Sequence, residues 1–355
     1  MSLPPAPPES DPPGPGTPTR PGRLQMADIA RIAGVSVATV SRALNGSTEV
    51  SAATRQRITE LARSLNYTIN VSAKNLRLRH NRTVAVVIPY DRQTRLHVSD
   101  PFFLSMLGSL ADALTDRGYD MLVSRIDADQ LENASLSYDS GTALGIILIG
   151  QWHSHDQLNR LADQGVPLVV WGAQLPQQRY CSVGGDNLGG GRLATRHLIE
   201  RGCRRFVFLG DPTTPESALR LRGHRHELAE AGLGPQACRV LAVGFDAARA
   251  RTEVGRLLEQ GVDFDAVVAC SDVLATAVVP VLRLHGREVP RDVAVVGYDD
   301  IEWASHADPP LTTVRQPVAR AGVEMVEALL ERVAGRDAPP RTLPVELVVR
   351  QSSMR

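Results

Sequence analysis

The chain has 355 residues, 43% of them hydrophobic, and its 39 basic and 39 acidic side chains cancel to a formal net charge of zero. This length exceeds one ordinary domain, so we expect more than one folding unit, each with enough apolar residues for a core. Four widely spaced cysteines without a C-x-x-C pair argue against a zinc cluster and a secreted disulfide framework. No stretch reaches the roughly 20 uncharged apolar residues that a membrane helix requires. We therefore expect a cytoplasmic protein that does not contact a membrane.

The first part of the chain differs from the rest in composition. Residues 1–22 are dense in proline and glycine and have no apolar signal-peptide core, which predicts a disordered tail. Between Arg23 and Arg82, ten basic residues stand against three acidic ones. A basic block on a neutral chain is typical of a nucleic-acid-binding unit.

Two short helices joined by a tight turn are predicted at residues 27–33 and 37–45. Gly34 stands at the turn, where a positive φ favours glycine, and Ser36 is placed to cap the second helix. This is the pattern of a helix-turn-helix, and an ordinary helical hairpin is the alternative. The side chains expected to face inward from the first helix are Ile29, Ala30 and Ile32.

The second helix of a helix-turn-helix presents its N-terminal residues to base edges in the major groove. Arg42 is the side chain there that can bond guanine O6 and N7 together, and Val37 and Ala38 can touch thymine methyl groups. Hydroxyl and amide side chains suit phosphates better. The candidates for that contact are Thr39, Ser41 and Asn45.

A third helix is predicted from the residue after Ser51 to residue 67, with one apolar face that closes the small core. Ser51 and Thr54 lie at its start, where hydroxyls and a free helix N-terminus can receive a phosphate. A plain capping role explains these two residues equally well.

The segment DIARIAGVSVATVSRALNGSTEVSAATRQRITELARSLNY resembles the LacI/GalR family of bacterial repressors, and its motif A-x-x-A-G-V-S-x-x-T-V-S-R is highly specific for that family. The resemblance implies a hinge helix at NVSAKNLRLR, in which Leu76 enters the minor groove with Ala73 beside it, while Lys74 and Arg77 lie against the backbone or the groove. So short a helix with few buried partners should fold only on DNA, in a dimer. A plain linker is the alternative.

From Thr83 onward, short apolar runs alternate with amphipathic segments, and the same alternation begins again after Gly185. This alternation predicts two lobes, each a parallel sheet covered by helices, with a cleft at the strand ends. The family resemblance implies a periplasmic-binding-protein-like fold and matches least well at residues 127–141, which we expect to be irregular. The expected organisation is a tail at 1–22, an all-α helix-turn-helix domain at 23–69, a hinge helix and linker at 70–82, and an α/β effector-binding domain at 83–355, with lobe one at about 83–184 and 316–343 and lobe two at about 185–315 and 344–355.

The resemblance also implies which residues line the cleft. Arg220, three residues before a glycine in ESALRLRG, matches the family's effector-binding arginine, and Asp299 in GYDD matches an acid that bonds ligand hydroxyls or amines. Ser271 replaces the usual asparagine, which leaves open which ligand hydroxyls are bound. The remaining positions implied by the resemblance are Asp100, Phe102 and Phe103 in DPFF and Phe245 in VGFD.

A buried arginine and aspartate flanked by aromatic faces can satisfy a polyhydroxylated ring from its edges and from above. Trp152 and Trp171, each at the end of an apolar strand, extend that aromatic supply. We therefore expect a sugar effector, a mono- or disaccharide. A structural ion pair between Arg220 and Asp299 and simple core packing of the two tryptophans are the alternatives.

No catalytic constellation or metal site stands out in the sequence. His153 and His155 flank Ser154, but no carboxylate or thiolate at zinc-site spacing accompanies them. The run DNLGGGR is neither a dinucleotide nor a Walker glycine loop, and a helix start at a lobe crossing explains it better. We expect no metal, no cofactor and no enzymatic activity.

The sequence thus predicts a transcription regulator, and more narrowly a repressor, that binds its operator as a homodimer under the control of a small molecule. By the family resemblance the operator is a palindrome with a central CG step. No leucine heptad follows Leu347, so we expect a dimer rather than a tetramer. A solute-binding protein of a transport system is the rival, disfavoured by the helix-turn-helix and by the lack of a signal peptide.

Overall fold

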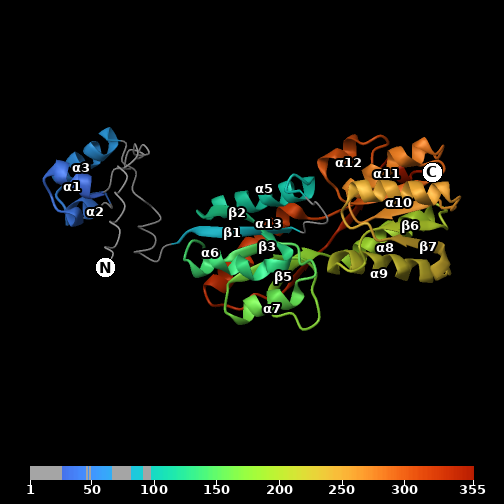
Figure 1. The fold of residues 1–355 in the computed structure, drawn as a ribbon, viewed down its shortest axis with the longest axis horizontal. Coiled ribbons are helices and arrows are strands. Elements are labelled where there is room, and N and C mark those ends of the chain that lie inside the picture. The colour runs from blue at the N-terminus through green and yellow to red at the C-terminus, as the bar shows by residue number, and fades with distance from the viewer. Residues whose placement is uncertain (1–25, 45–46, 48, 66–80, 91–96) are drawn as a thin grey trace, which may run out of the picture. The chain divides into compact units, whose positions relative to one another are not determined.

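The computed structural model describes residues 26–44, 47, 49–65, 81–90 and 97–355 (Figure 1). The chain divides into two compact units, residues 1–80 and 81–355. The expected tail at residues 1–22 and the expected hinge positions lie outside the described residues. Within those residues, no helix is both long enough and apolar enough to cross a membrane.

The first unit contains three helices: α1 (Met26–Ala33), α2 (Val37–Leu44) and α3 (Ala52–Ser64). Gly34 takes a φ of +66°, and the amide of Val35 donates to the carbonyl of Ala30 at 3.1 Å, which ends α1 and turns the chain. Ser36 caps α2 by accepting from the amide of Thr39 at 3.1 Å. α3 ends at Ser64, earlier than predicted.

The core of this unit comes from all three helices. Ile29, Val40 and Ile58 are fully buried, and small side chains between them let the helices approach closely. Ile32 is 51% exposed, so the prediction that it faces inward is wrong. The inward stripe of α1 consists of the buried Ile29 and Ala30 and the partly buried Ala33, and the side chain of Ile32 projects beyond its edge.

The second unit contains two six-stranded sheets, one in each lobe (Figure 1). In lobe one every neighbouring pair is parallel. All of the residues from Val84 to Ile88 are buried, which explains why β1 is an unbroken apolar run. The strands of lobe one, in sheet order, are β11 (Arg341–Leu343), β5 (Cys181–Gly185), β4 (Leu168–Trp171), β3 (Ile146–Ile149), β1 (Thr83–Tyr90) and β2 (Asp120–Asp127).

Lobe two repeats this plan with one antiparallel strand, which pairs Thr313 with Val348 at the edge of the sheet. The other neighbours are parallel. The strands of lobe two, in sheet order, are β12 (Glu346–Val348), β10 (Thr312–Arg315), β9 (Ala294–Asp299), β8 (Ala266–Ala269), β6 (Phe206–Leu209) and β7 (Cys238–Leu241).

Helices cover both faces of each sheet, as the sequence predicted. In lobe one, α5 (Pro101–Thr115) and α13 (Val318–Val333) cover one face, and η1 (Ala128–Ser135) and α7 (His155–Asp163) cover the other. The segment expected to be irregular carries η1 and α6 (Leu136–Asp139). The helices of lobe two are α8 (Asn187–Glu200), α9 (Pro215–Glu230), η2 (Pro235–Ala237), α10 (Ala247–Glu259), α11 (Asp272–Leu284), α12 (Glu302–His306) and η3 (Gln351–Ser353).

The chain passes between the lobes three times: after β5, after β10 and after β11. The first crossing leads into α8, whose start at DNLGGGR is capped by Asp186 through the amide of Gly189 at 2.8 Å. The lobes are therefore joined by three short segments that lie close to the carboxyl ends of their parallel strands.

α8 and α9 approach so closely that two glycines are required. A Cβ on Gly191 would lie 2.1 Å from the carbonyl oxygen of Arg220, and one on Gly223 would lie 2.1 Å from that of Leu188. Both obstacles are backbone atoms, which cannot move aside as a flexible side chain can. This contact fixes α9, and with it Arg220, against the first turn of α8.

We predict that Gly191→Ala lowers the free energy of unfolding by about 3 kcal/mol, because the added methyl group must separate two packed helices. Gly255→Ala is the matched control, since its Cβ would meet only ordinary contacts at 3.7 Å or more in the middle of α10. The control should raise stability by up to about 1 kcal/mol through helix propensity. Chemical denaturation of both variants measures the difference, and equal stabilities would contradict the packing argument.

Candidate functional site

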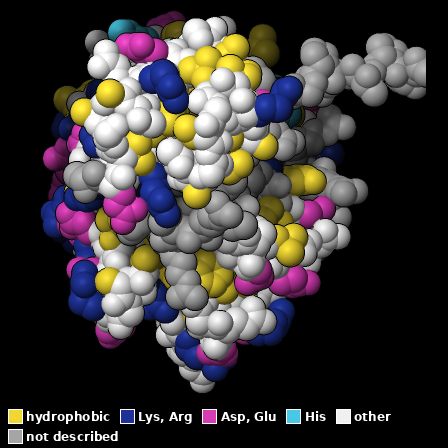
Figure 2. All heavy atoms as spheres, turned by 90° about the vertical axis from the view of Figure 1, so that its left-hand side faces the viewer, with side chains coloured by type: hydrophobic (Ala, Val, Ile, Leu, Met, Phe, Trp, Pro, Cys, Tyr) yellow, Lys and Arg dark blue, Asp and Glu magenta, His cyan; other side chains and the backbone are white. Residues whose placement is uncertain are grey.

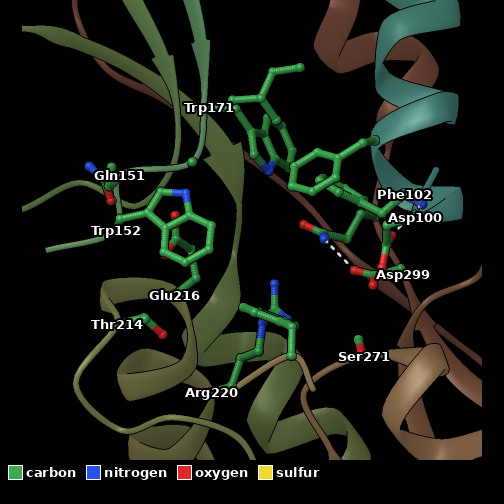
Figure 3. A pocket seen from close by; sticks show the side chains of 15 residues that line it. Asp100, Phe102, Gln151, Trp152, Trp171, Thr214, Glu216, Arg220, Ser271 and Asp299 are labelled. Carbon is green, nitrogen blue, oxygen red and sulfur yellow. Dashed lines mark hydrogen bonds between the residues drawn. The ribbon is translucent and has the colours of Figure 1, made fainter. Parts of the chain in front are cut away.

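A pocket that is open to solvent lies in the cleft of the second unit (Figure 3). It is lined by the ends of β3, β4, β8 and β9, the loop before α10, the first two turns of α9, the starts of α5 and α11, and the crossing segment after β10. All nine residues that the sequence predicted for the cleft line it: Asp100, Phe102, Phe103, Trp152, Trp171, Arg220, Phe245, Ser271 and Asp299. The other lining residues are Ile149, Gly150, Gln151, Thr214, Glu216 and Gln316.

Aromatic rings form much of the wall in lobe one. The rings of Phe102 and Trp171 have centroids 6.1 Å apart at an interplanar angle of 42°, and Phe102 also contacts Phe103 edge to face at 5.8 Å. Trp171 and Phe103 are both buried members of the lobe-one core, so they serve packing and the pocket together. Trp152 has a φ of +49° in the turn after β3, which places its ring at the pocket instead of along the strand.

Arg220 projects from α9 into the pocket (Figure 3). Its Nε donates to the Asn187 side-chain oxygen at 2.8 Å, and Nη1 donates to the carbonyl of Cys270. Its guanidinium carbon lies 3.6 Å from the ring centre of Tyr298, a cation–π contact. A buried guanidinium always keeps its charge, and these three neighbours hold it in one orientation.

Asp299 ends β9 with a φ of +111° and accepts a hydrogen bond from Gln316 Nε2 at 2.7 Å. Burial raises the pKa of this carboxyl well above its ordinary value, against the opposing charge of Arg220. Arg220 and Asp299 thus bond to other groups instead of closing a structural ion pair with each other. Each retains bonding capacity toward the pocket.

The next residue serves the framework instead of the pocket. Asp300 has a φ of +55° and accepts from Arg315 at 2.6 Å and Arg350 at 2.7 Å. Two adjacent aspartates in left-handed conformations cost free energy that the surrounding bonds must offset. The pair therefore directs one carboxylate toward the pocket and the other toward the strands at the lobe crossing.

A buried acid behind the pocket holds this segment in place. The carboxylate of Asp272 accepts from the Thr313 hydroxyl and from the amide of Ile301 at 2.9 Å. Burial raises its pKa to about 7, which these two hydrogen bonds oppose. Asp300 raises the same pKa and Arg350 lowers it.

Four polar lining residues were not predicted from the sequence. Gln151 is fully buried; its side-chain oxygen accepts from the amide of Ala173 at 2.9 Å and its nitrogen donates to Tyr180 Oη at 3.0 Å, so it ties together the turns after β3 and β4. Thr214 and Glu216 begin α9, and Gln316 lies on the crossing segment. Acids and hydroxyls are common at helix starts, so their residue types alone gave no signal.

Ser271 has a structural role as well as a place in the pocket. Its hydroxyl caps α11 by accepting from the amide of Leu274 at 3.2 Å. A hydroxyl can accept and donate together, so capping leaves its hydrogen available to the pocket.

The described DNA-facing candidates lie on the first unit. Val37, Ala38 and Arg42 are exposed on α2, and Arg42 pairs with Glu49 at 3.2 Å across two exposed side chains. Thr39 and Ser41 are half-buried. The Ser51 hydroxyl accepts from the amide of Thr54 at 3.3 Å. This is the capping bond, one of the two roles expected for these residues. Asn45, Ala73, Lys74, Leu76 and Arg77 lie outside the described residues.

The molecular face drawn in Figure 2 shows Lys and Arg side chains interspersed with acidic and apolar ones. The described residues in this view present no dense patch of a single sign. An exposed pair such as Arg42–Glu49 contributes little to stability, so its arginine can exchange partners at small cost.

The His, Cys, Asp and Glu side chains of the described residues form neither a metal-binding group nor a reactive thiol. No group of three or more His, Cys, Asp or Glu there is arranged to hold a metal ion. His155 bonds through Nδ1 to Tyr180 Oη at 3.0 Å. Burial raises the pKa of the Cys181 and Cys270 thiols to about 11, which keeps them protonated and unreactive.

Both parts of the chain match known families. The profile for bacterial regulatory proteins of the lacI family matches residues 25–70, and the profile for a periplasmic binding protein-like domain matches residues 195–353. The "HTH-type transcriptional regulator CelR" of Thermobifida fusca is 37% identical over 93% of this chain and 98% of its own. The "HTH-type transcriptional regulator DegA" of Bacillus subtilis is 31% identical over 93% of this chain and 98% of its own.

Solved structures agree with these relatives. The lac repressor dimer bound to operator and the anti-inducer ONPF superimposes with a TM-score of 0.81 at 26% identity, covering 94% of this chain and all of that one. The CelR–cellobiose complex superimposes with a TM-score of 0.68 at 33% identity, covering 93% of this chain and all of that one.

A helix-turn-helix followed by a two-lobed periplasmic-binding-protein-like domain defines a DNA-binding regulator with a sensor domain. The chain belongs to the LacI family of bacterial regulatory proteins, as the sequence predicted. Because these relatives match across both units and are named as regulators, the chain is a transcriptional regulator and neither an enzyme nor a transport solute-binding protein.

The raised pKa of Asp272 predicts how stability depends on pH. The unfolded chain loses this proton near pH 3.8 and the folded chain near 7, so the folded state holds the extra proton between them. Stability from this group therefore falls as pH rises through that window, by roughly 4 kcal/mol in total. Asp272→Asn removes the titration.

Urea denaturation of wild type and Asp272→Asn between pH 4 and pH 8 measures this difference. The wild-type free energy of unfolding should decline with pH more steeply than that of the variant, and other titrating groups cancel in the comparison. Parallel pH profiles would show that Asp272 titrates normally.

Proposed function

We propose that this regulator is a repressor that binds operator DNA through α2 and that a mono- or disaccharide in the pocket controls that binding. The observation that carries the proposal is the pocket itself, which Arg220 and Asp299 of lobe two line together with aromatic side chains of lobe one. Aromatic faces pack on the apolar face of a sugar ring, while charged groups bond its hydroxyls. Cellobiose is the first candidate, because the CelR structure similar to this chain is a cellobiose complex.

We further propose that the protein acts in the cytoplasm as a homodimer on a palindromic operator with a central CG step. The lac repressor dimer bound to operator supports the dimer and the DNA partner. Residues 70–82 are assigned as hinge and linker, with Leu76 as the minor-groove wedge, Ala73 beside it, and Lys74 and Arg77 along the duplex. Wedging costs a few kcal/mol of unstacking, which contacts to the bent duplex recover.

Effector control requires different affinities of the ligand for two lobe arrangements. The pocket is lined by both lobes, and Gln316 on a crossing segment bonds directly to Asp299. A coupling of about 1–3 kcal/mol changes operator affinity about 5- to 150-fold. A sugar that bonds Asp299 therefore acts on the segment that joins the lobes.

We predict that cellobiose raises the thermal unfolding midpoint of the wild-type protein, adding about 2.7 kcal/mol at 100 times its dissociation constant. Glucose, maltose, lactose and ribose complete the panel. Arg220→Ala should abolish the shift, because it removes the fixed donor of the pocket. Arg222→Ala, on the exposed face of the same helix, is the control and should respond like wild type. No stabilisation by any sugar would contradict the proposed effector class.

Arg42→Ala should reduce the preference for the operator over random DNA by about 1–3 kcal/mol, because one bidentate guanine contact is lost. Non-specific binding and its salt dependence should change little. Fluorescence anisotropy on palindromes with a central CG step and on random duplexes measures both. Arg31→Ala on α1 is the control, expected to leave sequence preference intact, and an unaltered preference in Arg42→Ala would refute the assignment.

A further inference from the structure

We infer that the pocket accepts an uncharged, hydroxyl-rich effector and rejects its anionic derivatives, such as uronates and sugar phosphates, and that Glu216 is the specificity-determining residue. The inference rests on the proposed sugar effector and adds the charge class of the ligand. It starts from the distribution of charge over the fifteen lining residues, all of which lie in the described part of the chain.

Three long helices, α5, α9 and α11, begin at the pocket, and a free helix N-terminus is a favourable place for an anion. Here the protein's own oxygens take those positions. Asp100 caps α5 by accepting from the amide of Phe102 at 2.9 Å, and Ser271 caps α11 through Leu274. Glu216 stands in the first turn of α9, where burial raises its pKa against the opposing bond from its own amide and the charge of Arg220. A ligand phosphate or carboxylate therefore finds one amide at the start of each of these helices already bonded to a side-chain oxygen.

The balance of side-chain charge points the same way. Among the lining residues Arg220 is the one cation, and three carboxyls, Asp100, Glu216 and Asp299, share the pocket with it. Burial raises the pKa of each of the three, so the pocket already disfavours negative charge. Part of the Arg220 guanidinium is also committed to Asn187 and the Cys270 carbonyl. An anionic ligand would lose its hydration on entering the pocket, and it would find no cation there that lacks other partners.

Neutral hydroxyls meet no such penalty. A hydroxyl can donate to a carboxylate of Asp299 or Glu216 and accept from Arg220, so a polyol satisfies both kinds of group at once. The aromatic rings of Phe102, Trp152 and Trp171 favour the apolar face of a ring over a charged chain.

Glu216 is singled out by its spacing from Arg220. The two residues are four positions apart on α9, and Figure 3 shows both at the pocket. At this spacing the charge of Arg220 lowers the pKa of Glu216 against the larger effect of burial, so the two groups interact inside the cavity. The Glu216 carboxyl also accepts from its own amide and from that of Gln151, as Asp100 and Asp299 accept from Phe102 and Gln316. Arg220 faces the charges of both Asp299 and Glu216. Replacing Glu216 with the isosteric, uncharged glutamine removes one of these two opposing charges and should ease the binding of an anion.

The experiment is isothermal titration calorimetry at pH 7 with the 6-uronate and the 6-uronamide of cellobiose, which match in size and differ in charge. Where another sugar of the panel binds more tightly, its own uronate and uronamide replace them. Wild type should bind the uronamide about 100-fold more tightly than the uronate. In Glu216→Gln that ratio should fall about tenfold, mainly through tighter uronate binding. Glu230→Gln, exposed near the end of the same helix, should keep the wild-type ratio.

A wild-type protein that binds uronate and uronamide equally overturns the charge selectivity and leaves the sugar effector standing. An unchanged ratio in Glu216→Gln, with the variant folded by its thermal midpoint, overturns the role of that residue. If no neutral sugar or derivative binds, the proposed effector class fails, and this inference fails with it.

Discussion

The buried guanidinium of Arg220 is the constraint on which the sensor unit depends. A charge at this depth is tolerated only with partners, and it takes them from three different elements: the first turn of α8, the end of β8 and the ring of Tyr298 on β9. Its position on α9 requires the close helix contact that Gly191 permits. Helix packing, the charge balance of the pocket and the placement of the ligand-facing donor are therefore parts of one arrangement.

From that arrangement the ligand site extends directly into the connection between the lobes. Asp299 and Asp300 are neighbours in sequence, yet one lies at the pocket and the other bonds Arg315 and Arg350. Gln316 bonds Asp299 from the crossing segment. A ligand that competes with Gln316 for this carboxylate changes the restraints on the crossing without any intermediate element. In the proposed coupling, the ligand therefore acts on the crossing segment through a single hydrogen bond, from Gln316 to Asp299.

The sequence allowed the class of fold and the pocket to be predicted because both rest on local patterns. Alternating apolar runs and helices indicated the two sheets. Family motifs indicated seven of the nine expected lining residues, and the strand ends indicated Trp152 and Trp171. Glu216 and Gln151 were not predicted, because they line the pocket only where turns that are distant in sequence meet. Residue type alone does not indicate such a meeting point. Ile32 was misplaced for a related reason: in a helix of only two turns, tertiary packing decides which edge of the stripe is covered. The hinge residues stay predictions.

The three crossings between the lobes have a further consequence for biosynthesis. The outermost strands of the two sheets at one edge are β11 and β12, which follow all the other strands in chain order. Until those residues leave the ribosome, β5 and β10 lack their outer neighbours and are themselves the exposed edges, which invites association with other chains. A nascent polypeptide therefore completes its two lobes almost simultaneously, while its DNA-recognition unit has long been synthesised.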